Sequence, residues 1–127
     1  MLRFLKAWLP VILWAALILS FANDRFSEGN TRGWIDQVLG DTPKLVNTIV
    51  RKGGHVTGYA ILGLLAWHAS RSLPGALLIA LAVSVTDETM QAMTAMREGS
   101  PYDVVLDTCA ALLALTLLPS VRRRLSR

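Results

Sequence analysis

Four apolar stretches alternate with polar segments along the chain, and this alternation predicts four helices. They cover about residues 5–22, 54–69, 76–93 and 102–118. Each is near the lower end of the roughly 17–25 residues that an α-helix needs to cross a bilayer. The pattern therefore predicts an all-α membrane protein, a single domain of residues 1–127 built as a bundle of four transmembrane helices.

Local signals refine two of these helices. The fourth has Ser100 as a candidate N-cap, Pro101 at the first helical position and Asp103 at the third, where a carboxylate can reach back to the cap. In the second stretch, Gly54 and Gly58 are four residues apart, so we expect a neighbouring helix to approach closely there.

The segment between the first two apolar stretches is polar, with mixed charges and several glycines. We interpret it as a longer first extracytoplasmic loop that carries short amphipathic helices. Apolar residues at helical spacing predict one such helix over residues 31–39, lying on the membrane surface. A second, from Pro43 to Val50, would deliver Arg51 and Lys52 to that surface.

The composition excludes an ordinary soluble domain and a nucleic-acid partner. Hydrophobic residues make up 53% of the 127 positions. The net charge of +4 comes largely from an arginine-rich tail that follows the last apolar stretch and lacks interleaved aromatics, which is typical of membrane topology rather than nucleic-acid binding. The single cysteine, Cys109, excludes an internal disulfide and is interpreted as a packing residue.

The cations that flank the apolar stretches predict the orientation in the membrane. Arg3, Lys6, Arg71 and the arginine tail all fall on one side of a four-span protein. The positive-inside rule then places both termini in the cytoplasm of a multi-pass protein of the cell membrane. Arg51 and Lys52 would lie on the outer face, against this bias, which favours a functional role for them.

The first apolar stretch also resembles a secretory signal peptide, with a basic start and Ser20-Phe21-Ala22 as a possible cleavage site. We favour a retained anchor because Trp8, near its cytoplasmic end, suits the interfacial aromatic belt.

Ionisable and polar groups recur at one depth in three of the predicted helices. With a rise of roughly 1.5 Å per residue, the polar positions of the second, third and fourth helices all fall near the outer face. Such groups are costly inside a membrane and are functional candidates. The predicted polar site comprises Lys52, His55, Tyr59, Asp87, Glu88, Gln91, Arg97, Asp103 and Asp107.

Three of these residues have simpler explanations. Asp103 could serve only as a helix cap, Lys52 could extend along the interface with its charge in water, and Tyr59 could be an interfacial aromatic. Asp87, Glu88 and Asp107 are harder to explain this way, because several buried carboxylates are an expensive means of holding helices together.

Three ordered motifs resemble the VanZ-like family of small bacterial membrane proteins. They are Arg51-Lys52-x-x-His55-x-x-x-Tyr59, Asp87-Glu88-x-x-Gln91, and Arg97 followed by Asp103-Val104-x-x-Asp107-Thr108, within residues 47–115. The family's founding member is associated with resistance to the glycopeptide teicoplanin, which implies a role in the cell envelope. This sequence departs from the pattern at Gly58, where members often carry Glu, at Ala110, where they often carry Gly, and before Arg97, which lacks the usual Pro-Gly.

The leading functional hypothesis is that the site binds or protects an envelope component, such as an anionic lipid, a lipid-linked phosphate or a glycopeptide. Arg97 and Lys52 would hold the anion. This hypothesis assigns a membrane lipid or lipid-linked component as partner and allows a homo-oligomer. It assigns no cofactor and no metal.

Two alternatives stay open. The first is an intramembrane enzyme acting on a lipid phosphate, with His55 as acid or base and with Asp87, Glu88 and Asp103 orienting it or holding Mg²⁺ or Mn²⁺. It is less favoured because the sequence has no His-x-x-x-His pair, no cysteine pair and no nucleophilic serine motif. The second is a proton-coupled carrier, which would need an oligomer.

Overall fold

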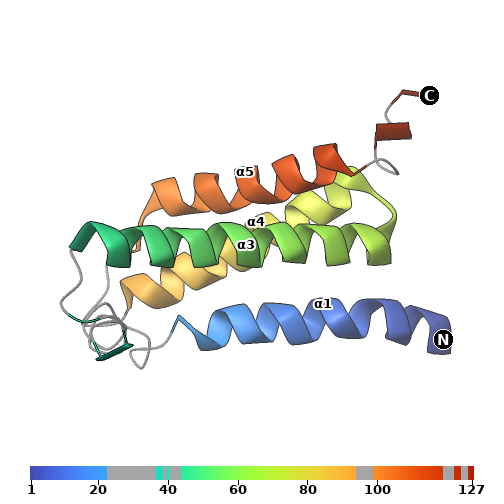
Figure 1. The fold of residues 1–127 in the computed structure, drawn as a ribbon. Helices are drawn as coiled ribbons and strands as arrows, with labels where there is room; N and C mark the ends of the chain where they lie inside the picture. Colours follow the sequence, from blue (N-terminus) through green and yellow to red (C-terminus); the bar gives the residue numbers. More distant parts are fainter. Residues whose placement is uncertain (23–36, 39, 41–43, 94–98, 119–121, 124–125) are drawn as a thin grey trace.

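The computed structural model describes residues 1–22, 37–38, 40, 44–93, 99–118, 122–123 and 126–127. Within them it has four long helices and no strand: α1 (Leu2–Ser20), α3 (Lys44–Ser70), α4 (Leu73–Ala92) and α5 (Pro101–Leu117) (Figure 1). The predicted all-helical fold with four main helices is confirmed. Most of the predicted surface helix at residues 31–39, and Arg97, lie outside the described residues.

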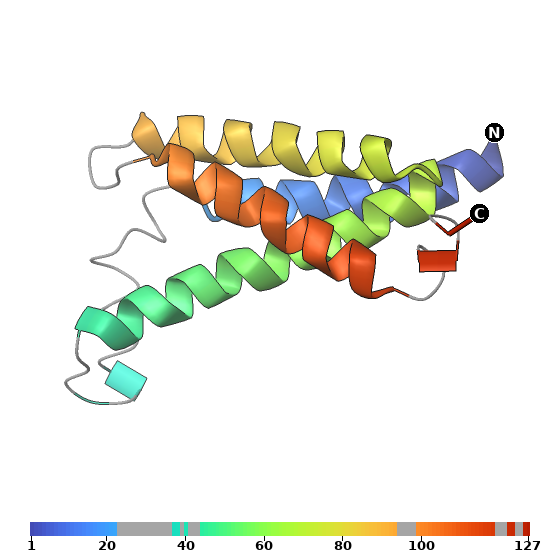
Figure 2. The same ribbon diagram turned by 90° about the horizontal axis from the view of Figure 1, so that it is seen from above.

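The helices are arranged so that α3, α4 and α5 pack against one another while α1 lies against α3 and α4. Figure 2 shows α3 and α5 crossing at an angle. The two chain ends lie at the same end of the bundle (Figure 1). At the opposite end α1 and α4 end, and α3 and α5 begin.

Helix α3 is longer than predicted. It begins at Lys44, ten residues before the predicted start, so the separate helix expected over Pro43–Val50 is continuous with the second apolar stretch. Glycine weakens a helix interior by only about 1 kcal/mol, and no proline interrupts the hydrogen-bond ladder of α3, so Gly53 and Gly54 do not end it. Arg51 and Lys52 therefore stand inside the helix.

The capping signals decide the beginnings of α4 and α5. Ser72 caps α4 by accepting the Gly75 N–H at 3.2 Å, so α4 begins at Leu73, three residues before the predicted start at residue 76. Ser100 caps α5 as predicted, accepting the Tyr102 N–H at 3.3 Å. Asp103 differs from the prediction, because its carboxylate contacts Lys52 of α3 instead of the cap.

Of the helix contact predicted at Gly54 and Gly58, only the part at Gly58 is found, where Trp14 and Ile18 of α1 lie against α3. A Cβ at Gly54 would meet nothing within 4 Å, and one at Gly58 would meet only the Ile18 side chain at 3.9 Å. The close approach occurs further along α3, where a Cβ on Gly63 would lie 2.9 Å from the Ala111 Cβ and 3.2 Å from its Cα. The reason is that α5 crosses α3 near its middle.

The distribution of polarity is the inverse of that in a soluble protein. Large apolar side chains are exposed on every helix, for example Leu13, Leu78 and Leu113, and Cys109, which we expected to be packed, is exposed among them. The buried polar side chains lie inside the bundle: Ser84, Asp87, Glu88, Gln91 and Asp107. A continuous apolar surface is typical of a protein that faces lipid. Among the described helices, α1 and α4 are long and apolar enough to cross a membrane.

The apolar core and the polar residues occupy different halves of the bundle. The buried apolar cluster includes Leu62, Ala66, Trp67, Ala76 and Leu115, towards the end where the chain termini lie. The polar groups gather towards the other end, where α3 and α5 begin and α4 ends.

Candidate functional site

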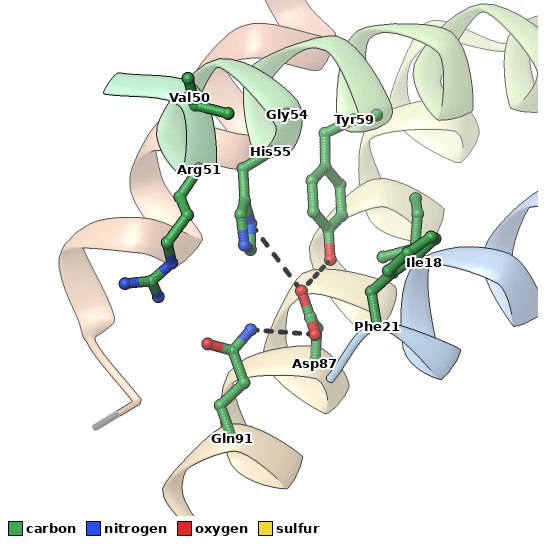
Figure 3. Close-up of a pocket in the computed structure, with 10 residues that line it drawn as sticks. Ile18, Phe21, Val50, Arg51, Gly54, His55, Tyr59, Asp87 and Gln91 are labelled. Atoms are coloured by element: carbon green, nitrogen blue, oxygen red, sulfur yellow. Dashed lines mark hydrogen bonds and ion pairs between the residues drawn. The ribbon is translucent and has the colours of Figure 1, made fainter. Parts of the chain in front are cut away.

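One face of α3 points into the polar half of the bundle. Arg51, His55 and Tyr59 are spaced four residues apart and therefore project from the same side of the helix. The His55 and Tyr59 rings are stacked, with centroids 6.2 Å apart and an interplanar angle of 20°. Figure 3 shows the His55 and Tyr59 side chains directed toward Asp87 of α4, with Gln91 of the same helix beside it.

Asp87 is the centre of this network. Its carboxylate, only 2% exposed, accepts the Tyr59 hydroxyl at 3.1 Å on Oδ2 and the Gln91 amide at 3.0 Å on Oδ1. His55 Nδ1 lies 3.9 Å from Oδ2 (Figure 3). Two neutral donors thus satisfy the acid, which is the condition for burying such a group without a large penalty.

Asp107 brings the third helix, α5, into the same cluster. It is fully buried, at 0% exposure, and its Oδ2 accepts a 2.7 Å hydrogen bond from the Ser84 hydroxyl of α4. Its Oδ1 lies 3.4 Å from His55 Nδ1. Sequence reasoning missed Ser84, although Ser84, Asp87 and Gln91 stand at the helical spacing that puts them on one face of α4.

Glu88 connects the end of α4 to the start of α5. It is 6% exposed, and its Oε2 accepts the Ser100 N–H at 2.9 Å. The two segments approach so closely at Gly99 that a Cβ there would overlap the Glu88 carbonyl oxygen and lie 2.9 Å from the Ala92 Cβ. Only glycine fits this position without displacing the backbone.

Lys52 and Asp103 lie at the rim of the site, not inside it. Lys52 Nζ is 3.4 Å from Asp103 Oδ1, and the two side chains are 58% and 30% exposed. The structure therefore brings together six of the nine predicted residues and places these two in a separate, partly solvated pair. Arg97 lies outside the described residues, so its role stays a prediction.

Three buried polar atoms in the cluster make no hydrogen bond: His55 Nδ1, Glu88 Oε1 and Asp107 Oδ1. Together with an Asp87 oxygen, they belong to a group of four side chains that each offer one ligand-type atom, all within 4.8 Å of one another. A buried polar atom without a partner costs about 1–3 kcal/mol, so three in one place require an explanation.

A cavity of about 340 Å³ opens beside this network, between α1, α3 and α4. The side formed by α1 is apolar, with Ile18 and Phe21, and Val50 and the two glycines that we expected to pack against a helix line the cavity from α3. The other side is polar, formed by Arg51, His55, Tyr59, Asp87 and Gln91. Sequence reasoning left Arg51 out of the predicted site, although its spacing of four from His55 could have indicated that it shares the face.

A second, largely apolar cavity adjoins the first between α1 and α3. This cavity of about 410 Å³ shares Ile18, Phe21, Gly54 and Gly58 with the first and extends along α1 to Trp14 and Leu17. The Trp14 indole N–H donates a 2.9 Å hydrogen bond to the Gly58 carbonyl and so holds α1 against α3. The site thus combines a polar end with a long apolar one.

Comparison with known proteins gives one finding. A protein-family model described as VanZ/LLP1 matches residues 7–122, a range that includes every residue of the predicted site. No curated protein and no solved structure gives a significant match.

Proposed function

Since the chain belongs to the VanZ/LLP1 family and two of its helices are apolar enough to cross a membrane, we propose that it is a multi-pass membrane protein that binds an anionic lipid or lipid-linked envelope component. The observation that carries this proposal is the cavity between α1, α3 and α4, which is polar on one side and apolar on the other. A lipid is divided in the same way, into a polar headgroup and apolar chains.

The polar side suits an anionic headgroup. Arg51 lines it from α3, and a guanidinium binds phosphate through two parallel, charge-assisted hydrogen bonds. Tyr59 and Gln91 are held on Asp87 by their hydrogen bonds, which gives this side of the cavity a defined shape. The second cavity, along Trp14, Leu17 and Ile18, suits the chain of the same molecule.

The proposed topology places this cavity at the outer leaflet. Four spans with both termini in the cytoplasm are supported by the termini lying at one end of the bundle and the polar site towards the other. Retention of α1 is part of the proposal, because Ile18 and Phe21 form the apolar wall. Because this chain resembles the founding member of the family only as a family relative, a role of this binding in the response to glycopeptides is part of the proposal and no resistance phenotype is assigned.

Lipid retention tests the proposal. Wild-type protein and Arg51→Gln would be reconstituted in nanodiscs of phosphatidylglycerol and phosphatidylcholine, and lipids kept after detergent extraction would be counted by native mass spectrometry. A hydrogen bond to a charged group contributes about 1.5–3 kcal/mol. We therefore expect Arg51→Gln to lower retention of the anionic lipid about tenfold or more, since 1.4 kcal/mol corresponds to tenfold.

Arg122→Gln is the matched control, because Arg122 is exposed in the C-terminal tail, at the other end of the bundle. It should retain lipid like the wild type. Equal retention of both lipids by the wild type, or equal retention of phosphatidylglycerol by wild type and Arg51→Gln, would contradict the proposal.

A second candidate function is an intramembrane enzyme that acts on a lipid phosphate. The observation in its favour is that His55 reaches the cavity while its Nδ1 lies 3.4 Å from Asp107, the arrangement of an imidazole oriented by a carboxylate. Release of phosphate from a lipid phosphate by the purified protein, lost in His55→Gln, would favour this function over binding alone.

A further inference from the structure

We propose that His55, Asp87, Glu88 and Asp107 form a binding site for one divalent metal ion where α3, α4 and α5 meet. The proposal is independent of which molecule occupies the cavity. It departs from the sequence-based interpretation, which assigned no metal and, in its enzyme alternative, used Asp103 as a ligand. The structure places Asp103 at the rim, paired with Lys52, and puts Asp107 inside the cluster.

The first observation is the size of the cluster. One nitrogen and three carboxylate oxygens, one from each side chain, lie within 4.8 Å of one another. Metal–ligand bonds of about 2.0–2.2 Å put two ligands on opposite sides of an ion about 4.2 Å apart. The most widely separated pair would therefore have to approach by only about half an ångström to bind opposite sides of one ion.

The second observation is that two of the buried carboxylates each have an oxygen that accepts no hydrogen bond. These oxygens are Glu88 Oε1 and Asp107 Oδ1, and the two residues are only 6% and 0% exposed. His55 Nδ1 is also buried without a hydrogen bond and faces Asp107 Oδ1 at 3.4 Å. Buried acceptors are normally satisfied. A cation between them would satisfy all three at once.

The third observation is how the carboxylates are held. A donor binds the other oxygen of each unsatisfied acid: the Ser84 hydroxyl on Asp107 Oδ2 at 2.7 Å, and the Ser100 N–H on Glu88 Oε2 at 2.9 Å. Asp87 differs, because Tyr59 and Gln91 donate to both of its oxygens, and a ligand bond from Asp87 would use the second lone pair of one of them. Metal ligands in proteins are oriented by such outer hydrogen bonds, which leave the remaining lone pair directed at the ion.

Charge supports a cation in this position. Three carboxylates meet in a low-dielectric region, where charges must be paired or neutralised. A divalent ion with a neutral imidazole would reduce the three negative charges to one. Protons shared among the carboxyl groups are the competing explanation, and they are an outcome of the test below.

The ligand types point to a first-row transition ion. Carboxylates suit Mg²⁺, Ca²⁺ and Mn²⁺, whereas an imidazole favours transition ions over Mg²⁺ and Ca²⁺. The combination of three oxygens and one nitrogen favours Mn²⁺ among the ions that carboxylates prefer. Access to the site is provided by the cavity, which His55 and Asp87 both line.

Titration with Mn²⁺ tests the site directly. The full-length protein, purified in detergent and stripped with a chelator, would be titrated while the electron paramagnetic resonance signal of free Mn²⁺ is recorded. We expect one saturable site per chain, with Mn²⁺ bound at least about tenfold more tightly than Mg²⁺ because of the imidazole. Mn²⁺ should also raise the thermal unfolding midpoint, since an ion that binds only the folded state stabilises it.

Two isosteric variants locate the ion. Asp107→Asn removes one ligand charge and should weaken Mn²⁺ binding by about 100-fold, because even the loss of an outer partner costs about 10–100-fold. Asp103→Asn is the matched comparison: the same change one helical turn away, on the acid that contacts Lys52, should alter the affinity less than about threefold. Should Asp107→Asn fail to fold, Glu88→Gln replaces it and is expected to show the same loss.

Each result decides the proposal. Stoichiometric Mn²⁺ binding that falls in Asp107→Asn or Glu88→Gln but not in Asp103→Asn supports it. No saturable binding to the folded wild type would overturn it and leave a network of carboxyl groups that share protons. If Asp103→Asn and Asp107→Asn weakened Mn²⁺ binding equally, the proposal would be overturned as well, because the ion would then be attracted by the overall negative charge and not held by the four ligands.

Discussion

At the scale of single residues, the site is defined by the hydrogen bonds that each buried carboxylate accepts. Asp87 is satisfied on both oxygens, whereas Asp107 and Glu88 are satisfied on one. Ser84 is therefore as much a part of the site as the acids themselves. Its hydroxyl is the hydrogen-bond donor to a fully buried carboxylate, Asp107.

Removal of this donor should destabilise the protein. Ser84→Ala would leave Asp107 Oδ2 without its 2.7 Å hydrogen bond, and an unsatisfied buried acceptor costs about 1–3 kcal/mol, so we expect the free energy of unfolding to fall by that amount. Equilibrium unfolding in mixed micelles would measure it. Thr86→Ala on the same helix is the control, because its exposed hydroxyl bonds only its own helix, at the Ala82 carbonyl. A smaller effect for Ser84→Ala than for Thr86→Ala would contradict this account.

At the scale of elements, the crossing of α3 and α5 sets where the polar groups meet. Their backbones approach closely where Gly63 faces Ala111, and Asp107 is one turn before that contact on α5. Small residues allow such an approach between helices in a membrane. Farther from the crossing, towards the start of α3, the two helices diverge (Figure 2). His55 and Asp107 both precede the Gly63–Ala111 contact along their helices.

Gly63→Ala should disrupt this crossing. The new Cβ would lie 2.9 Å from the Ala111 Cβ, and overpacking of this kind costs about 1–3 kcal/mol of unfolding free energy. The double variant Gly63→Ala with Ala111→Gly should recover part of the loss, because it restores the space. Gly53→Ala is the control: its Cβ would meet nothing within 4 Å, so the better helix propensity of alanine should leave stability unchanged or raised. The unfolding midpoint of each variant would be measured. If Gly53→Ala lost as much stability as Gly63→Ala, the cause would not be steric.

At the scale of the whole molecule, many large apolar side chains face outward, and a group of polar side chains is buried in the bundle interior. The apolar core lies towards the end where the chain termini meet, and the polar site towards the other end. Because the two ends of the bundle differ, the orientation of the protein in the membrane decides from which side the cavity is reached.

We expect both termini in the cytoplasm and four spans. A reporter active only in the cytoplasm should give signal when fused after Arg127 and none when inserted within residues 23–44, while a reporter active only outside should give the reverse. The physical reason is the distribution of cations in the short flanks. The intact mass of the purified protein should include residues 1–22. A cytoplasmic signal from the inserted reporter, or loss of those residues, would reject the topology.

The sequence alone determined the helical class, the family resemblance and six of the polar residues that the structure brings together. These follow from periodicity and from the rarity of ionisable groups in apolar helices, which are local properties of the chain. Ser100 as the cap of α5 was predicted for the same reason, because a cap depends on residues within one turn.

Only the tertiary structure decided which of these groups touch. A depth estimate places residues along a helix axis, but it does not give the rotation of one helix against another, which depends on side-chain packing at contacts such as Gly63 with Ala111. That rotation turned Asp107 toward His55 and Asp103 toward Lys52, although the two acids are one turn apart. It also brought Arg51 to the cavity and made Gly54 and Gly58 part of its wall.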